Sequence, residues 1–214
     1  MTALPDAILA VDPGDDTGLA LLWELWAPRP RLWTATLQFR ALPVEAGRVQ
    51  RAVAKRQWPC VPHGAFSCVA YAAELMEPAR PRRGATEHEL RGLSQSVIKA
   101  TRIEGQVYQA LSRCLSPEIG PPHLYPCREW RKLIGAERMK GPLAKVAAKA
   151  YVADHLGADV PEHEAEAACI ALWHLDVLRK AAKGEELGLP EVPRRTRRTP
   201  LPEAVTEKLA PERG

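Results

Sequence analysis

The residue whose setting most favours chemistry is Asp12, which follows an apolar run at residues 7–11 and precedes Pro13 and Gly14. A short apolar run that ends in a turn signal is typical of a buried strand. A carboxylate at the end of such a strand can project into a cleft and bind a hard cation through oxygen. The simpler alternative is that Asp12 only starts a β-turn, as Asp-Pro-Gly sequences often do.

A second carboxylate, Glu74, closes another apolar run at residues 66–73. If the two runs form adjacent strands, Asp12 and Glu74 lie side by side at one edge of a sheet. Two carboxylates at such a short distance repel each other unless a cation lies between them. Two alternatives stay open: Glu74 is only the first solvated residue after its strand, or Glu77 is the second acid in its place.

A third group lies at the start of the last predicted helix, where His163 and Glu166 are three residues apart and share a helix face. The same face continues through Ile170, Trp173 and Val177, which we expect in the core. His163 and Glu166 should therefore point into the molecule. Glu162 and Glu164 are expected to face solvent and to complement the helix N-terminus. That capping role is also the alternative for His163 and Glu166.

The elements that must position these side chains are predicted from periodicity and turn signals. Strands are expected at 7–11, 17–25, 31–42, 66–73 and, after Pro121 and Pro122, at 123–126. Helices are expected at 44–58, 87–114, from near Arg128, at 142–156 and at 162–182. The first three strands form an antiparallel meander, and strands then alternate with helices. This order predicts an α/β fold of the RNase H-like type, a mixed five-stranded sheet flanked by helices.

Composition sets the outer limits. Of the 214 residues, 1–183 are expected to form one domain of moderate size, and 184–214 a basic tail rich in Pro and Arg that is disordered. The net charge of +4 is weak support for a polyanionic partner. Five scattered cysteines without a Cys-x-x-Cys pair argue against disulfides or a zinc ribbon. Without a signal peptide or membrane span, a soluble cytoplasmic protein that does not use a membrane is expected.

At these residues the sequence resembles the RuvC family of Holliday-junction resolvases. The strand that ends in Asp12-Pro13-Gly14 is similar to the family's opening motif, and Glu74 matches its second acid. The last helix resembles the pattern Asp-x-x-Asp-Ala-x-x-Ile-Ala, with His163 and Glu166 at the two acidic positions. The family's Pro-x-x-x-Lys-x-x-x-Gly segment and the lysine that opens its next helix are followed here by Pro126, Arg131, Leu133, Gly135 and Lys140. The likeness covers roughly residues 7–178.

The chain also departs from the family. A histidine at 163 is known in some resolvases and can ligate a metal when neutral, and Glu166 is one methylene longer than the family's aspartate. The aromatic residue that often unstacks a junction base is replaced by Glu77. An insertion at 78–86 lengthens the same loop. Its Arg80, Arg82 and Arg83 would reach junction DNA, or the loop has no partner.

The resemblance implies a metal-dependent endonuclease that resolves four-way DNA junctions by paired nicks. Two Mg²⁺ ions per site are expected, with Mn²⁺ as a substitute, held by Asp12, Glu74 and Glu166, and by His163 unless that residue handles protons. Basic residues expected on the DNA backbone are Arg131, Lys132, Arg138, Lys140 and Lys145. Such an enzyme works as a homodimer, here through helix 87–114, in a bacterial cell or a phage-infected host. Its branch-migration partners stay open.

Two alternatives keep the same scaffold. One is a nuclease that acts on flaps, forks or other branched DNA, which the residues at 77 and 166 leave room for. The other is a noncatalytic nucleic-acid-binding module, supported by the two substituted acidic positions. Metal titration and cleavage of different branched substrates discriminate among the three hypotheses.

Overall fold

The computed structural model describes residues 5–38, 68–75, 84, 86–114, 118–139 and 141–185. Several sequence predictions lie outside these residues. They are helix 44–58, Glu77, the arginines of the 78–86 insertion (Arg80, Arg82, Arg83), Lys140 and the tail from 186 onward.

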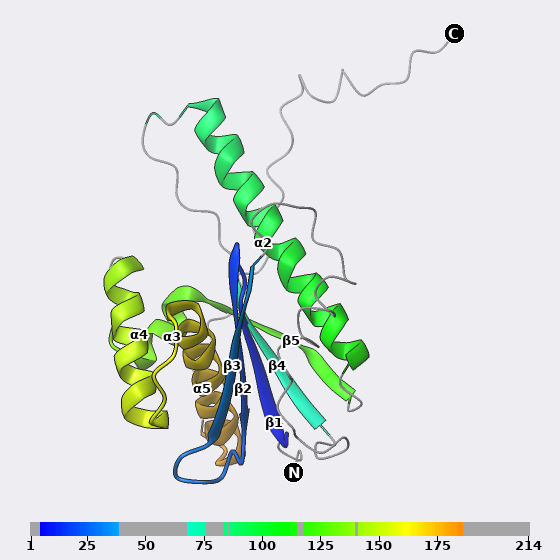
Figure 1. The fold of residues 1–214 in the computed structure, drawn as a ribbon, viewed down its shortest axis with the longest axis vertical. Coiled ribbons are helices and arrows are strands. Elements are labelled where there is room, and N and C mark those ends of the chain that lie inside the picture. Colours follow the sequence, from blue (N-terminus) through cyan, green and yellow to red (C-terminus); the bar gives the residue numbers. More distant parts are fainter. Residues whose placement is uncertain are drawn as a thin grey trace.

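A five-stranded mixed sheet forms the centre of the fold, with strand order β3-β2-β1-β4-β5 (Figure 1). The strands are β1 (Ala7–Asp12), β2 (Asp16–Trp23), β3 (Arg31–Gln38), β4 (Cys68–Leu75) and β5 (Glu118–Pro126). β2 pairs antiparallel with both β1 and β3, whereas β4 is parallel to both β1 and β5. The predicted meander followed by parallel strands is confirmed.

Helices cover both faces of this sheet. On one face lie α3 (Cys127–Leu133), α4 (Gly141–Leu156) and α5 (Glu162–Ala182), and on the other lies α2 (Glu87–Cys114) (Figure 1). β1 is therefore buried on both sides, which explains why it is apolar throughout rather than alternating. Its Ile8 and Ala10 pack in the core under α5, and its Leu9 and Val11 pack in the core under α2.

The register places a row of residues across the sheet on the α5 side. Asp12 pairs with Gly18 of β2, and Gly18 pairs with Thr36 of β3. On the other side, Glu74 lies one residue beyond the pair Val11–Ala73 and pairs with Tyr125 of β5. Because side chains alternate between faces along a strand, all these residues look toward the same layer of helices. The sheet thus sets Asp12 and Glu74 side by side, as the sequence predicted.

β5 differs from its prediction, since it starts at Glu118 rather than His123 and contains Pro121 and Pro122. It is an edge strand, and its pairing with β4 shifts register between Val69 and Tyr71, opposite these prolines. Proline lacks an N–H to donate, so it is tolerated at edges and bulges of a sheet. The prediction was wrong because proline was taken as the boundary of a strand whose neighbours were unknown.

In the part of the chain that the structure describes, no helix is long and apolar enough to cross a membrane.

Candidate metal centre

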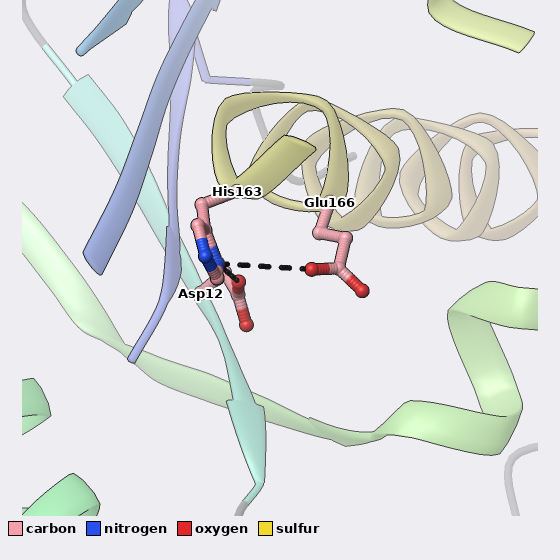
Figure 2. Close-up of side chains that lie close together, drawn as sticks. All are labelled: Asp12, His163 and Glu166. Carbon is pink, nitrogen blue, oxygen red and sulfur yellow. Dashed lines mark hydrogen bonds and ion pairs between the residues drawn. The ribbon is translucent and has the colours of Figure 1, made fainter. Parts of the chain in front are cut away.

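The end of β1 meets the start of α5 at one edge of the sheet (Figure 2). There the Nδ1 of His163 lies 3.3 Å from Oδ2 of Asp12 and 3.9 Å from Oε2 of Glu166. The spacing of His163 and Glu166 puts both on the inner face of the first turn and a half of α5, as the helical period predicts. The fold therefore brings together three of the four predicted site residues.

Asp12, His163 and Glu166 each offer one ligand atom, and these atoms all lie within 4.8 Å of one another. Two carboxylates and one imidazole are a suitable donor set for Mg²⁺ or Mn²⁺, since oxygen suits both ions and nitrogen is better accepted by Mn²⁺. Glu166 is buried, and Asp12 and His163 are half-buried. The group thus lies partly sheltered from solvent, with two of its three side chains incompletely buried.

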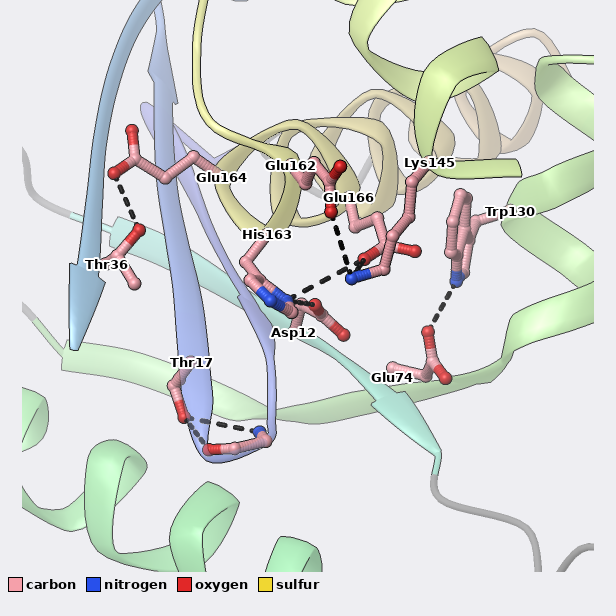
Figure 3. A network of polar contacts seen from close by, with 11 residues as sticks. Asp12, Thr17, Thr36, Glu74, Trp130, Lys145, Glu162, His163, Glu164 and Glu166 are labelled. Atoms are coloured by element: carbon pink, nitrogen blue, oxygen red, sulfur yellow. Dashed lines mark hydrogen bonds and ion pairs between the residues drawn. The ribbon is translucent and has the colours of Figure 1, made fainter. Parts of the chain in front are cut away.

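Glu74, the fourth predicted residue, lies on the far side of Asp12 and outside this compact group (Figure 3). Its Oε2 accepts a hydrogen bond of 2.9 Å from the indole Nε1 of Trp130 in α3. Trp130 is fully buried, so its ring fixes the direction of the Glu74 carboxylate. The sequence marked Trp130 only as a helical residue, because nothing local shows that it would reach a strand 56 positions earlier.

The pKa values of two carboxyl groups in this centre, those of Glu74 and Glu166, are raised. Burial, and after it the charge of Asp12, raises the pKa of Glu74 to about 8. The same two causes raise the pKa of Glu166 to about 7, against the opposing charges of Lys145, His163 and Arg131. Buried carboxylates that repel one another gain from a cation placed between them. A cation bound among these carboxylates would therefore lower both pKa values.

The pKa of His163 is also raised, but for a histidine this favours the charged form. Its hydrogen bond with Asp12 is the largest cause that raises the pKa of His163, while partial burial and the charge of Lys145 lower it. A proton on Nδ1 is thus stabilised as long as Asp12 is ionised. Binding a metal through this nitrogen would require the proton to leave.

Cationic side chains flank the centre. Lys145, from the first turn and a half of α4, places its Nζ 3.3 Å from Glu162 and 3.9 Å from Glu166 (Figure 3). The guanidinium of Arg131 lies 5.3 Å from the ring centroid of Trp130, and its charge acts on both Glu74 and Glu166. Both residues were predicted to contact DNA, and the structure places both beside the carboxylates of this centre.

Lys132 is placed differently from those two. It bonds to Glu129 within α3, at 3.0 Å, and its side chain is half exposed. The structure does not bring it to the cluster of Asp12, His163 and Glu166.

The prediction for Glu164 was wrong. This residue was expected in solvent, but it is only 7% exposed and it accepts hydrogen bonds from two hydroxyls of β3. Thr36 donates to its Oε1 at 2.8 Å, and Thr34 donates to its Oε2. The start of α5 lies so close to the sheet that this residue faces β3 while His163 and Glu166 face Asp12. Glu162 does face outward, as predicted, and pairs with Lys145.

The turn after Asp12 is closed by its own residues. The hydroxyl of Thr17 donates to the carbonyl of Gly14 at 2.7 Å and accepts from its N–H at 3.3 Å. Asp15, in the same turn, forms an ion pair with Lys99 of α2. The turn that carries Asp12 is thereby tied to the helix on the opposite face of the sheet.

Comparison with known proteins identifies the fold. No protein-family model and no curated sequence matches the chain. Among solved structures, Thermus thermophilus RuvC in complex with a Holliday junction substrate matches with a TM-score of 0.53 and 19% identity, over 82% of this chain and 96% of that one. Another Thermus thermophilus RuvC structure gives 0.48 at 20% identity, over 83% and 96%. The yeast mitochondrial Holliday junction resolvase gives 0.39 at 12%, over 83% of each chain.

The first of these matches shows that the chain has the RNase H-like fold of RuvC. The predicted resemblance to that family is thus confirmed at the level of the fold, including the mixed sheet and its flanking helices.

Proposed function

We propose that this protein is a divalent-metal-dependent endonuclease that cuts branched DNA, chiefly four-way junctions, with Mg²⁺ or, in its place, Mn²⁺. One observation carries the proposal. In a fold shared with a RuvC that is bound to a Holliday junction, Asp12, His163 and Glu166 converge from β1 and α5 with ligand atoms within 4.8 Å of one another. Burial and mutual repulsion raise the pKa values of Glu74 and Glu166, and a cation bound among these acids would relieve that repulsion.

The residues of the centre have different proposed roles. Asp12 and Glu166 would hold a metal through oxygen and His163 through nitrogen, and Glu74 is an oxygen donor beside Asp12 for a second ion. A pair of such ions, when bound, supplies an activated water and stabilises charge on the leaving oxygen. Lys145 and Arg131 stand beside the carboxylates and would position the DNA backbone without reading its sequence.

Paired nicks require two such centres, since a single site cuts one strand, so the proposed enzyme is a homodimer. The surface that fits is the first half of α2. Ile103 and Val107 in its second half are fully buried against the sheet, whereas Ile98 in its first half is 59% exposed. A second copy of α2 would cover this apolar side chain.

The test is cleavage of a synthetic mobile four-way junction by the full chain, beside flap and Y-shaped DNA, with Mg²⁺ or Mn²⁺. We expect symmetric nicks in the junction, and we expect Asp12→Asn to abolish cleavage while junction binding stays largely intact. Preferential cutting of flaps or forks would move the substrate assignment to other branched DNA. Full activity of Asp12→Asn would contradict the proposed metal centre. If the protein binds DNA but calorimetry detects no metal binding, the noncatalytic module is favoured.

A further inference from the structure

The start of α5 rests directly on the sheet at Gly18. A Cβ added to Gly18 would lie well inside 3.0 Å of the carbonyl carbon and oxygen of His163, a range that real Cβ atoms essentially never show, and 3.1 Å from the nitrogen of Glu164. The atoms it would meet belong to the backbone, so no side-chain rotation could relieve the clash. Gly18 also pairs directly with Asp12 across the sheet. The missing side chain at this one position therefore sets how close the helix start comes to the metal-binding carboxylate.

Hydrogen bonds on the next strand fix the same helix turn from the side. Glu164 is buried and accepts hydrogen bonds from the hydroxyls of Thr34 and Thr36 of β3. Figure 3 shows the bond from Thr36. Thr36 is the partner of Gly18 in the sheet, so the polar anchor and the close approach are neighbours. Two hydrogen bonds to the same carboxylate restrict its orientation from both of its oxygens. The bonds from the two threonines to Glu164 thus fix the rotation of α5 about its own axis. Gly18 sets the distance between the start of α5 and the sheet.

Both features act on the residues on either side of Glu164. His163 precedes it and Glu166 follows two positions later, and both point to Asp12 when Glu164 points to β3 (Figure 3). A rotation that released Glu164 from the threonines would carry both candidate ligands away from Asp12. A displacement of about 1 Å at catalytic groups can cost about 100-fold in rate.

We propose that Gly18, Thr36 and Glu164 are positioning residues that dock the first turn of α5 on β2 and β3, and thereby hold His163 and Glu166 at metal-binding distance from Asp12. This inference rests on the proposed metal-dependent nuclease, and it concerns residues that touch neither the metal nor the DNA.

The experiment uses the full chain and the variant Gly18→Ala. Gly120→Ala is the matched control, because Gly120 is also a strand glycine but its added Cβ would meet nothing closer than a backbone oxygen at 3.8 Å. We expect Gly18→Ala to bind Mn²⁺ about 10-fold more weakly in calorimetry and to cut a four-way junction about 100-fold more slowly. Amide hydrogen exchange should also rise in the peptide that covers the first turns of α5. Gly120→Ala should match the wild type in all three measurements.

A second pair of variants, at Thr36, tests the inference if Gly18→Ala does not fold. Thr36→Val removes the hydroxyl at nearly constant shape, whereas Thr36→Ser keeps it. We expect Thr36→Val to require about 10-fold more metal for half-maximal cleavage and to recover at saturating metal, and Thr36→Ser to behave as wild type. Merely structural damage would lower activity at every metal concentration, and the serine variant would not restore the metal requirement.

The outcomes separate this inference from the proposed function. If the wild type neither binds metal nor cuts DNA, the proposed function fails, and hydrogen exchange alone decides: raised exchange at the start of α5 in Gly18→Ala or Thr36→Val supports the docking role. If a folded Gly18→Ala binds Mn²⁺ and exchanges like the wild type, the positioning role is overturned. The same holds if Thr36→Val and Thr36→Ser are indistinguishable from the wild type.

Discussion

The two sides of the candidate metal centre are built on different physical grounds. On the side of α5, His163 and Glu166 contact Asp12 or each other at 3.3–3.9 Å, and Lys145 adds a positive charge. On the side of α3, Glu74 is held by the indole of Trp130, within apolar packing. Burial is the largest cause of the raised pKa on both sides. Glu166 has three opposing charges, those of Lys145, His163 and Arg131, whereas Glu74 is opposed by the bond from Trp130 and the charge of Arg131. We therefore expect the α5 side to ionise and accept a metal ion more readily, and Glu74 to be the acid that limits full occupancy.

The largest effect expected from this comparison is loss of cleavage when either acid is neutralised. Glu166→Gln and Glu74→Gln should each lower the cleavage rate about 1000-fold, which corresponds to about 4 kcal/mol of transition-state stabilisation. The two variants should differ in calorimetry. Glu166→Gln should weaken the tightest Mn²⁺ site, and Glu74→Gln should remove only the weaker one. Loss of the tight site in Glu74→Gln instead would reverse the assignment of the two sides.

Next in size is removal of the indole that holds Glu74. Trp130→Phe keeps most of the buried ring but deletes the N–H, so the Glu74 oxygen loses a donor, which costs about 1–3 kcal/mol of unfolding free energy. Cleavage should fall about 10-fold, as for other partners that orient a metal ligand. Trp26→Phe is the control, because Trp26 is 65% exposed and should change neither quantity. Wild-type cleavage in a stably folded Trp130→Phe would show that the indole does not orient the acid.

A pH dependence follows from the raised pKa values. A carboxyl with a higher pKa in the folded than in the unfolded protein keeps its proton longer when folded, so its stabilising contribution is present below the unfolded value near 4.5 and is lost as pH rises through 7 to 8. The metal-free protein should therefore lose thermal stability between about pH 5 and about pH 8.

Added Mg²⁺ should restore stability more at the upper end of that range, because protons compete with the ion below it. Differential scanning calorimetry at several pH values measures both effects. The Glu74→Gln variant should show a flatter profile without metal, since the residue with the higher pKa is gone. A stabilisation by Mg²⁺ that does not depend on pH would contradict the proposed ligands.

The smallest expected effect concerns the cation on the α5 side. Lys145→Ala should weaken junction binding by roughly 3- to 10-fold and reduce the salt slope of the binding constant by about 1, as for one lost phosphate contact. Lys149→Ala is the matched control, because Lys149 lies one helical turn further along α4. Its Nζ pairs with Asp159 at 3.6 Å rather than with a carboxylate of the candidate metal centre. Equal losses in both variants, measured by fluorescence anisotropy at several salt concentrations, would mean that Lys145 acts only through general charge.

Much of this fold was predictable from local patterns. The apolar run before Asp12 and the helical period through His163 and Glu166 depend only on near neighbours along the chain, and both led to correct elements. The order of strands and helices then placed Asp12 and Glu74 on adjacent strands. The errors arose where a distant neighbour decides. Proline at 121 and 122 is tolerated because β5 is at the edge of the sheet, and Glu164 is buried because β3 provides two hydroxyls.

The sequence by itself determined which chemical groups could meet: two acids at strand ends, and a histidine and an acid on one helix face. Residue type and periodicity suffice for this, since they act within a few positions. Only the tertiary structure decided how those groups are held. The bond from Trp130 to Glu74 joins residues 56 apart, and the bond from Thr36 to Glu164 joins residues 128 apart. The height and rotation of α5 on the sheet arise from packing between such segments, and no local pattern contains them.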